Sequence, residues 1–180
     1  FGDGIAEDGA VALRFLDAGL EFLVSSSFSK NFSLYGERVG ALSVVCADAA
    51  QSGRVLSQLK IAVRTNYSNP PTHGAQIVAT VLTTPSLRAT WEQELAGMRG
   101  RIREMRQALV DSLGRAGVKQ DLSHYTTQRG MFSYTGLTAA QMQRLREDHA
   151  IYGVDSGRIC VAALNAGNLD RVVKAVVSVM

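Results

Sequence analysis

Hydrophobic residues recur along this 180-residue chain at two spacings, and the alternation between them predicts the elements of the fold. Apolar positions three or four residues apart predict helices over residues 8–18, 48–66, 72–82, 138–149 and 169–179. Short apolar runs with β-branched or aromatic residues predict strands over residues 21–26, 39–47, 131–134, 151–154 and 158–162. Helices that alternate with strands in this way indicate an α/β fold.

Several elements carry signals for where they begin, where they end or how they are buried. Asp48 and Thr138 are expected to cap the helices that follow them, the latter in a capping box with Gln141. The pair Pro70 and Pro71 is expected to end the preceding helix, because proline lacks the amide that a helix needs. The continuous apolar run over residues 39–47 is typical of a strand that is covered on both faces.

One predicted helix is much longer than the others. Its apolar residues lie three or four positions apart along one stripe, and they are Trp91, Leu95, Met98, Ile102, Met105, Leu109 and Leu113. Thr84 and Pro85 provide an N-cap and a first helical residue. A helix of this length commonly connects two domains. We therefore predict one domain over residues 1–97 and a second over residues 98–180.

Composition and charge favour a globular protein and exclude several function classes. Hydrophobic residues make up 46% and charged residues 19%, which is enough for a core. No apolar run is long enough to span a membrane. The net charge of +3 is too small to indicate nucleic-acid binding. The basic cluster Arg99, Arg101, Arg103 and Arg106 alternates around a helix with glutamates between, so we interpret it as a solvated face.

The cysteines, histidines and first residues add three expectations. Cys46 and Cys160 lie in apolar runs, which favours free thiols and a reducing, cytoplasmic setting. The three histidines share no metal-ligand spacing with one another or with the cysteines, so no metal is expected. The chain opens at Phe1 without a methionine or a signal segment. We therefore expect it to be the C-terminal portion of a longer protein.

The segment with the most chemical content follows the first predicted strand. Lys30 stands in a serine-rich stretch with Ser27 and Ser29, and Arg38 follows after a short loop. Hydroxyls and a guanidinium suit a phosphate monoester, and a partly desolvated lysine suits a Schiff base. Together they suggest pyridoxal phosphate. The alternative is a polar turn with an exposed lysine and a surface arginine.

The string SFSKNFSLYGERVG (residues 27–40) closely resembles the lysine motif of the class I aminotransferases, in the aspartate and aromatic-amino-acid subgroup. The resemblance continues in order through VRTNYSNPP (63–71), WEQEL (91–95), GMFS (130–133) and SGR (156–158). It implies the C-terminal part of a type I PLP-dependent transferase fold. Residues 1–97 would then be part of the large PLP-binding domain, and residues 98–180 the small α/β domain, joined by the long helix.

The same resemblance implies roles for the residues around the coenzyme. Lys30 would form the Schiff base with pyridoxal 5'-phosphate and then move the proton between the substrate Cα and the coenzyme. Arg38 and Ser27 would bind the phosphate. Ser29, next to the lysine, would either join them or only shape the loop. Loss of the Lys30 amine is expected to abolish proton transfer.

The resemblance also implies how the amino acid and 2-oxo acid substrates are held. Arg158 would bind the substrate α-carboxylate through a bidentate pair, and Phe132 would line the pocket beside it. Arg64 would reach the neighbouring subunit's site and bind a side-chain carboxylate, which implies a homodimer with shared active sites. Without the motif, Arg64 would be a helix-terminal cation and Phe132 a core residue.

Two questions of function remain open at the level of sequence. The finer similarity, as in residues 53–60 and 128–137, favours tyrosine and phenylalanine with 2-oxoglutarate as acceptor, and aspartate aminotransferase is the alternative. A non-catalytic binding module with an aminotransferase-like fold is a further alternative. In this family, the residues that contact the coenzyme ring lie upstream of the position where this chain starts. We therefore expect the 180-residue chain alone to be inactive.

Overall fold

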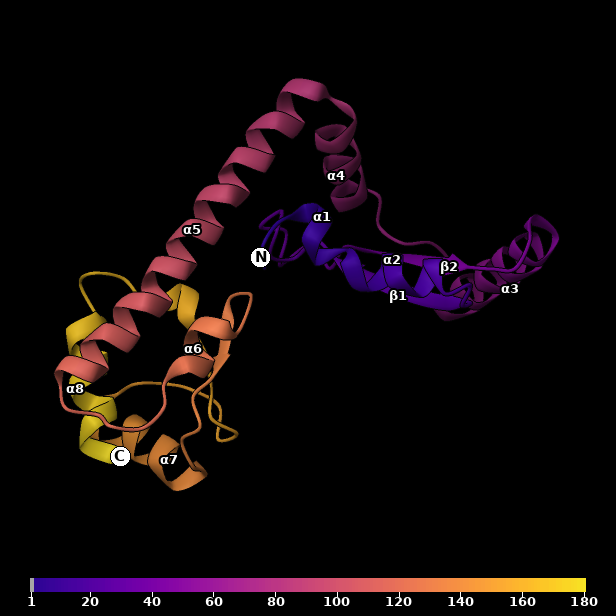
Figure 1. The fold of residues 1–180 in the computed structure, drawn as a ribbon. Helices are drawn as coiled ribbons and strands as arrows, with labels where there is room; N and C mark the ends of the chain where they lie inside the picture. Colours follow the sequence, from indigo (N-terminus) through magenta and orange to yellow (C-terminus); the bar gives the residue numbers. More distant parts are fainter. Residues whose placement is uncertain (1) are drawn as a thin grey trace. The chain divides into compact units, whose positions relative to one another are not determined.

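The structure is a computed structural model in which residues 2–180 are described. The chain divides into two compact units. The first comprises Ile5–Leu95, and the second comprises Ala96–Met180 together with the N-terminal residues up to Gly4. One continuous helix, α5 (Pro85–Arg115), contributes residues to both (Figure 1). The assignment of residues 1–97 and 98–180 to the large and small domains of a longer protein stays a prediction.

The first unit contains a two-stranded antiparallel sheet and several helices. Strand β1 (Phe22–Ser27) pairs with β2 (Gly40–Val45), with Phe22 opposite Val45 and Ser27 opposite Gly40. The helices before α5 are α1 (Ile5–Asp8), α2 (Ala10–Asp17), α3 (Ala49–Tyr67) and α4 (His73–Thr83). The predicted helices and strands of this half are confirmed, with ends shifted by a few residues.

Local signals explain where these elements begin and end. The side chain of Asp48 accepts a hydrogen bond from the amide of Gln51 at 2.6 Å, so the predicted N-cap of α3 is confirmed. Gly19 adopts φ +68° just after α2, in the left-handed region that glycine enters without strain. Helix α3 ends at Tyr67, shortly before the two prolines.

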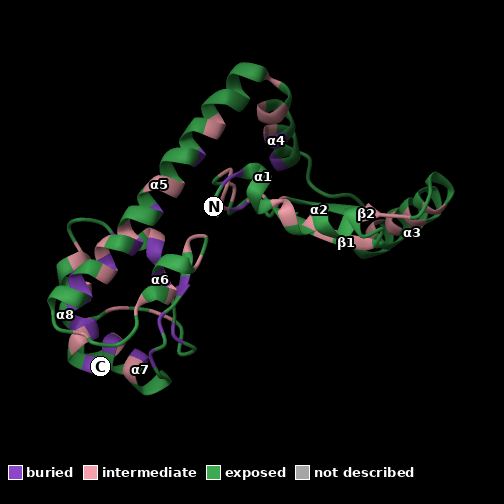
Figure 2. Cartoon of the chain, in the orientation of Figure 1, coloured by how far each residue is buried: buried purple, intermediate pink, exposed green. Residues whose placement is uncertain are grey.

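The expectation that the strand over residues 39–47 is covered on both faces is wrong for this chain, and its partner strand is exposed as well. Leu23 on β1 is 67% exposed and Leu42 on β2 is 49% exposed. Burial of both faces requires a layer on each side of a sheet, and within residues 2–180 this sheet has only two strands. Most of the first unit is correspondingly exposed (Figure 2). The apolar run of β2 is therefore surface in the chain as it stands.

The second unit contains most of the buried core. After α5 it comprises α6 (Ser123–Thr127), β3 (Phe132–Tyr134), α7 (Ala139–His149), β4 (Arg158–Cys160), a short 3-10 turn (Val161–Ala163) and α8 (Leu169–Val179). The side chains buried most completely are Leu109, Leu113, Met142, Leu145, Val161 and Ser133. Buried positions accordingly recur on α5, α7 and α8 in Figure 2. The predicted apolar stripe of the long helix thus supplies part of this core.

Two features of the second unit bear on the sequence predictions. The capping box at Thr138 and Gln141 is confirmed, with both of its reciprocal hydrogen bonds present. The predicted strand over residues 151–154 is wrong. That segment instead leads into a turn, in which the amide of Val154 donates to the carbonyl of Arg158 and the amide of Gly157 donates to that of Val154. Strand β4 ends at Cys160, before the predicted end at residue 162.

Three further findings concern membrane spans, metal sites and cysteines. In the part of the chain that the structure describes, no helix is long and apolar enough to cross a membrane. Within residues 2–180, no group of three or more histidine, cysteine or acidic side chains is arranged to hold a metal ion. Cys46 and Cys160 are both free thiols.

Tyr125 is a titratable group inside the core of the second unit, and it makes stability sensitive to alkaline pH. Its hydroxyl donates to the carbonyl of Thr135 at 3.3 Å, and its side chain is almost fully buried. Burial raises the pKa of Tyr125 to about 12, and the hydrogen bond to Thr135 opposes this rise. The folded protein therefore holds the phenolic proton more tightly than the unfolded chain does.

We predict that the free energy of unfolding is unaffected by Tyr125 below about pH 10 and falls by roughly 2–3 kcal/mol as pH rises towards about 12. Urea titrations at a series of pH values measure it. Tyr125→Phe keeps the ring and removes the proton, so its unfolding free energy should show less of this loss. The same alkaline loss in both proteins would refute the assignment.

Candidate functional site

Lys30 lies in the loop that connects β1 to β2, directly after the strand ends at Ser27. Its ammonium nitrogen is 4.0 Å from the centroid of the Tyr35 ring. The guanidinium carbon of Arg38 is 5.8 Å from the same ring centroid. The loop therefore folds back on itself, so that one aromatic ring brings the two predicted cofactor-binding cations together.

The backbone of this loop is shaped around Arg38. Arg38 itself has φ +52°, in the left-handed region that non-glycine residues rarely adopt. Its guanidinium donates to the carbonyl of Tyr35 at 3.0 Å, which keeps the side chain over the loop. Such backbone strain typically costs about 1–3 kcal/mol. It is found at positions where the orientation of a side chain matters.

Two predicted hydroxyl ligands lie on the other arm of the loop. The Ser27 hydroxyl contacts that of Ser29 at 3.2 Å, and it also accepts a hydrogen bond from the Ser29 amide at 3.3 Å. Ser29 is buried, whereas Ser27 is exposed. Ser29 is thus built into the loop, and the hydroxyl of Ser27 is the more accessible of the two.

The surroundings of the Lys30 loop are closely packed. A Cβ added at Gly40 would come within 2.6 Å of the carbonyl oxygen of Ser26, so only glycine fits opposite the end of β1. On the far side, a Cβ at Gly74 would come within 3.1 Å of the side chains of Glu37 and Val39. The start of α4 therefore packs directly against the loop segment that carries Arg38.

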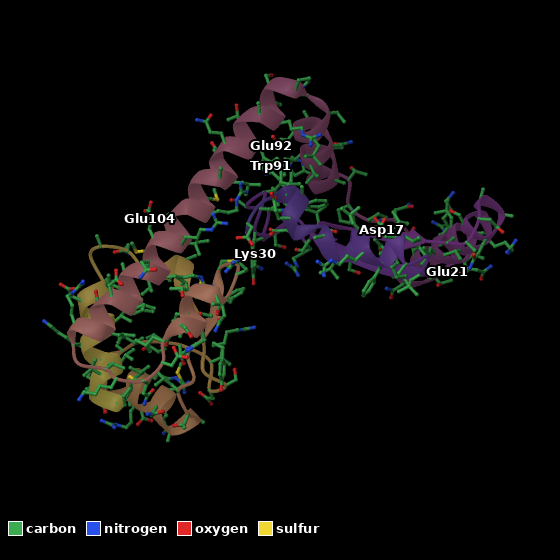
Figure 3. All side chains as sticks on the ribbon, in the orientation of Figure 1. Asp17, Glu21, Lys30, Trp91, Glu92 and Glu104 are labelled. Carbon is green, nitrogen blue, oxygen red and sulfur yellow. The ribbon has the colours of Figure 1, made fainter. Side chains whose placement is uncertain are left out.

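Trp91 of α5, which is labelled in Figure 3 together with Lys30, contacts the two residues that follow the lysine. Its indole nitrogen donates to the carbonyl of Asn31 at 2.7 Å. Its ring stacks on Phe32 at a centroid distance of 4.6 Å and an interplanar angle of 23°, and Phe32 meets Phe28 edge to face. The two residues after the lysine are thus held by a hydrogen bond and an aromatic stack.

A cavity of about 500 Å³ adjoins Arg38 in the first unit. Tyr67 lines it from the end of α3, Thr72 from the segment between α3 and α4, and Ala75 and Gln76 from α4. Among residues 2–180, neither Lys30 nor Arg38 has a carboxylate within ion-pair distance. Of the predicted ligands, only Arg38 lines this cavity. Within the described residues, two cations without an anionic partner and two hydroxyls in the same loop form a donor set suited to an anion such as a phosphate ester.

Arg64 lies in the last turn of α3, and its contacts differ from those of the Lys30 loop. Its guanidinium donates to the hydroxyl of Ser68 at 2.8 Å, and Ser68 has φ +69°. The contacts of the described residues do not connect it with Lys30 or Arg38. The exposed position of Arg64 is compatible with the expectation that it serves another subunit, which stays a prediction.

The predicted substrate-binding residues Arg158 and Phe132 come together in the second unit. Strands β3 and β4 are antiparallel, with Tyr134 opposite Arg158 and Phe132 opposite Cys160. The guanidinium carbon of Arg158 lies 5.0 Å from the centroid of the Phe132 ring. Both side chains are exposed, and Arg158 has no ion-pair partner among residues 2–180. A planar cation on the face of a ring is an accessible site for a carboxylate.

The turn before Arg158 is fixed by a glycine. Gly157 has φ +87°, and a Cβ there would come within 2.9 Å of the carbonyl oxygen of Leu137. Its own carbonyl accepts hydrogen bonds from both the amide and the hydroxyl of Thr135, at 2.9 and 2.8 Å. The backbone before Arg158 is therefore anchored to the segment that follows β3.

The interpretation of the arginines on the long helix as a solvated face is wrong for Arg106. This side chain is only 3% exposed. It donates four hydrogen bonds of 2.7–2.8 Å, to the carbonyls of Tyr125, Gly130 and Phe132 and to the hydroxyl of Ser133. Burial, and then the nearby charge of Arg129, lower the pKa of Arg106. The Arg106 guanidinium can be buried because four well-placed acceptors replace its hydrogen bonds to water.

Sequence reasoning proposed Lys30, Arg38, Arg158 and Phe132 for binding but missed three residues that hold them. Tyr35 lies between the two cations, and Trp91 secures the loop. Arg106 could have been recognised from its spacing, since it lies four residues after Ile102 and three before Leu109 on the apolar stripe. A charged residue at such a position needs partners in the core.

Comparisons with known proteins agree along nearly the whole chain. The sequence model of the family described as "Aminotransferase class I and II" matches residues 1–176. A Pseudomonas aeruginosa protein named aspartate aminotransferase is 60% identical over 180 residues, covering 100% of this chain and 45% of that protein. An Escherichia coli protein named aromatic-amino-acid aminotransferase is 54% identical, with the same coverage. The chain thus spans about 45% of the length of these curated relatives.

A solved structure agrees with the fold. The crystal structure of an aromatic-amino-acid aminotransferase from Burkholderia pseudomallei, covalently bound to pyridoxal phosphate, matches with a TM-score of 0.95 and 59% sequence identity. The match covers 99% of this chain and 45% of that one. The expected fold, α/β and part of a PLP-dependent transferase, is confirmed.

We predict that Trp91→Phe loosens the Lys30 loop. The phenyl ring preserves stacking on Phe32 but cannot donate to the carbonyl of Asn31, so local opening should become easier by about 1 kcal/mol. Amide hydrogen exchange of residues 28–33 should accelerate roughly fivefold. Gln93→Ala, an exposed change two residues further along α5, is the matched control. Unchanged exchange in Trp91→Phe would show that the hydrogen bond does not secure the loop.

Proposed function

The chain belongs to the class I and II aminotransferase family, and from this premise we propose that the protein containing it transfers amino groups between amino acids and 2-oxo acids with pyridoxal 5'-phosphate. The chain covers 45% of its relatives' length, so the proposal concerns the whole protein. The observation that carries it is the arrangement of Lys30 and Arg38 around Tyr35, in a loop that also contains Ser27. An amine, a guanidinium and a hydroxyl are the groups that a phosphorylated aldehyde needs.

The residues present fit that coenzyme. Arg38 would bind two phosphate oxygens through its planar fork, and Ser27 would donate its exposed hydroxyl to the same group. Ser29 is buried and bonded within the loop, which favours a loop-shaping role over that of a ligand. When bound, the coenzyme would supply an electron sink that makes the substrate Cα–H bond acidic.

Lys30 would have two tasks in this reaction. Its amine would attach the coenzyme covalently, and once substrate has displaced it, the same amine would carry the proton away from Cα. The loop around Lys30 suits both tasks, because Trp91 binds the backbone at Asn31 while Lys30 as a residue is only half-buried and its ammonium group contacts Tyr35. A fixed backbone with a side chain free to move allows one group to act at two positions.

Arg158 would bind the substrate α-carboxylate by a bidentate pair, and Phe132 would orient the guanidinium by lying beneath it. Orientation of the carboxylate fixes where the Cα–H bond points, which is the contribution of binding to rate. Arg64 would bind a side-chain carboxylate in the partner subunit's site, so we propose a homodimer. The free thiols Cys46 and Cys160 support a reducing, cytoplasmic location.

We propose tyrosine and phenylalanine as amino donors, with 2-oxoglutarate as acceptor. The similarity of residues 53–60 and 128–137 to the aromatic enzymes supports this choice. Aspartate is the second candidate, because the relative with 60% identity is named aspartate aminotransferase. Both activities would use Arg158 and Arg64 for substrate carboxylates, so these two residues do not distinguish an aromatic donor from aspartate.

We predict that Lys30→Ala in the full-length protein lowers kcat/KM for transamination by roughly 10⁴-fold, because the amine that moves the Cα proton is lost. Lys60→Ala, which removes an exposed lysine from α3, is the matched control and should leave the rate unchanged. A coupled spectrophotometric assay of 2-oxo acid formation measures both. If Lys30→Ala retained wild-type activity, the proposed function would be wrong.

A second prediction concerns the amino donor. The kcat/KM for tyrosine with 2-oxoglutarate should equal or exceed that for aspartate in the full-length protein, because the pocket is proposed to accept an aromatic ring. Parallel initial-rate measurements with both donors decide it. A preference for aspartate of roughly a hundredfold or more would refute the aromatic assignment and leave transamination in place.

A further inference from the structure

We infer that Arg106 is a positioning residue for substrate binding, acting through the backbone of β3 on Phe132 and Arg158. The inference rests on the proposed function, which assigns Arg158 to the substrate carboxylate. The guanidinium of Arg106 is buried in the core of the second unit, and all four of its hydrogen bonds go to one chain segment.

The hydrogen bonds of Arg106 all go to residues 125–133. One terminal nitrogen donates to the carbonyl of Tyr125 and the hydroxyl of Ser133, each at 2.8 Å. The other donates to the carbonyls of Gly130 and Phe132, at 2.8 and 2.7 Å. Each terminal nitrogen thus connects two points of the same segment. The planar guanidinium thereby holds the loop between α6 and β3 in one conformation.

A second network holds the same strand from a neighbouring residue. The Ser133 hydroxyl donates to the side-chain oxygen of Gln128 at 2.8 Å, and the same oxygen accepts from the amide of Tyr134 at 2.8 Å. The amide group of Gln128 donates to the carbonyl of Tyr134 at 3.1 Å. Ser133 therefore connects Arg106 with Gln128, and between them these two side chains bind the backbone of Phe132 and Tyr134 and the hydroxyl of Ser133.

Side chains alternate between the two faces of β3, so a fixed β3 backbone also fixes the side chains on the face where the substrate is proposed to bind. Ser133 points to the buried face and is 2% exposed, so its neighbours Phe132 and Tyr134 point to the opposite, exposed face. The centroid of the Phe132 ring lies 5.0 Å from the guanidinium carbon of Arg158, and Tyr134 of β3 is the residue opposite Arg158 of β4 in the register. A shift of β3 would therefore move the ring on which the carboxylate-binding cation rests.

The chemistry of the acceptors favours a positioning role over a charge-pairing one. Arg106 binds three backbone carbonyls and a hydroxyl, and among residues 2–180 it takes part in no ion pair. Lysine has no planar fork and would satisfy fewer of these acceptors at once. The arrangement thus requires the shape of the guanidinium as well as its charge.

The test compares Arg106→Met and Arg106→Lys in the full-length holoenzyme with the wild type. Arg106→Met should raise KM for the amino acid by about tenfold and change kcat by less than about threefold, because binding geometry is lost while Lys30 is untouched. Arg106→Lys should rescue part of the loss. Coenzyme content per subunit, measured by absorbance, should be unchanged in both. Arg99→Met removes a half-buried arginine from the same helix and is the matched control.

Two further measurements keep the proposal testable. Ser133→Ala is the substitute variant in case Arg106→Met does not fold. It removes one of the four acceptors and should raise KM for the amino acid by roughly two- to fivefold. Calorimetric binding of the 2-oxo acid substrate requires no turnover, so weaker binding by Arg106→Met than by Arg99→Met supports the inference even in an inactive preparation. An inactive wild type would contradict the proposed function.

A KM and a 2-oxo acid affinity within twofold of wild type in a folded Arg106→Met protein would overturn the role of Arg106. So would a parallel loss of kcat and coenzyme content, which indicates general loosening of the fold.

Discussion

The short distance between the Lys30 ammonium and the Tyr35 ring is the interaction on which the account depends. It brings the amine close to the Arg38 guanidinium, although the two residues lie eight positions apart in sequence. The loop bends this tightly because Arg38 adopts a left-handed conformation and Gly40 meets Ser26 with no room for a side chain. Two cations held close, with no carboxylate partner among residues 2–180, create a positive potential that favours an anionic ligand.

The two units reach their binding geometry by different physical means. In the first, aromatic contacts predominate: Tyr35 lies between the cations and Trp91 stacks on Phe32. In the second, polar contacts in the core predominate: Arg106 is surrounded by neutral acceptors, and the strand it holds carries Phe132. A buried charge whose terminal nitrogens donate four hydrogen bonds is costly to disturb, because removal of one partner leaves another group unsatisfied. Such a network specifies a single position for the strand.

Much of the fold was predictable because its signals are local. Asp48 and Thr138 cap helices through hydrogen bonds to residues three positions away, and the spacing from Trp91 to Leu113 contains the core stripe of α5. The cofactor-binding candidates also lie within one continuous motif around Lys30. Two predictions failed because they concern partners distant in sequence. Burial of the apolar run at residues 39–47 requires a layer on each face of the sheet. Residues 151–154 would form a strand only if a second strand paired with them.

Arg106 shows most clearly what a sequence pattern omits. Charge predicted exposure, but the burial of this side chain depends on three carbonyls whose positions arise only when β3 folds against α5. Tyr35 and Trp91 were overlooked for a related reason. Their roles lie in the distances from their rings to Lys30, Arg38 and Phe32, and a linear motif contains no such distances.

The most direct test of the central claim is chemical. Borohydride makes the bond between pyridoxal phosphate and its lysine permanent, so reduction of the full-length holoenzyme followed by peptide mapping identifies the attachment site. The account predicts one equivalent of coenzyme per subunit, on the peptide that contains Lys30. Coenzyme attached to a different lysine, or no attachment despite bound coenzyme, would contradict the account.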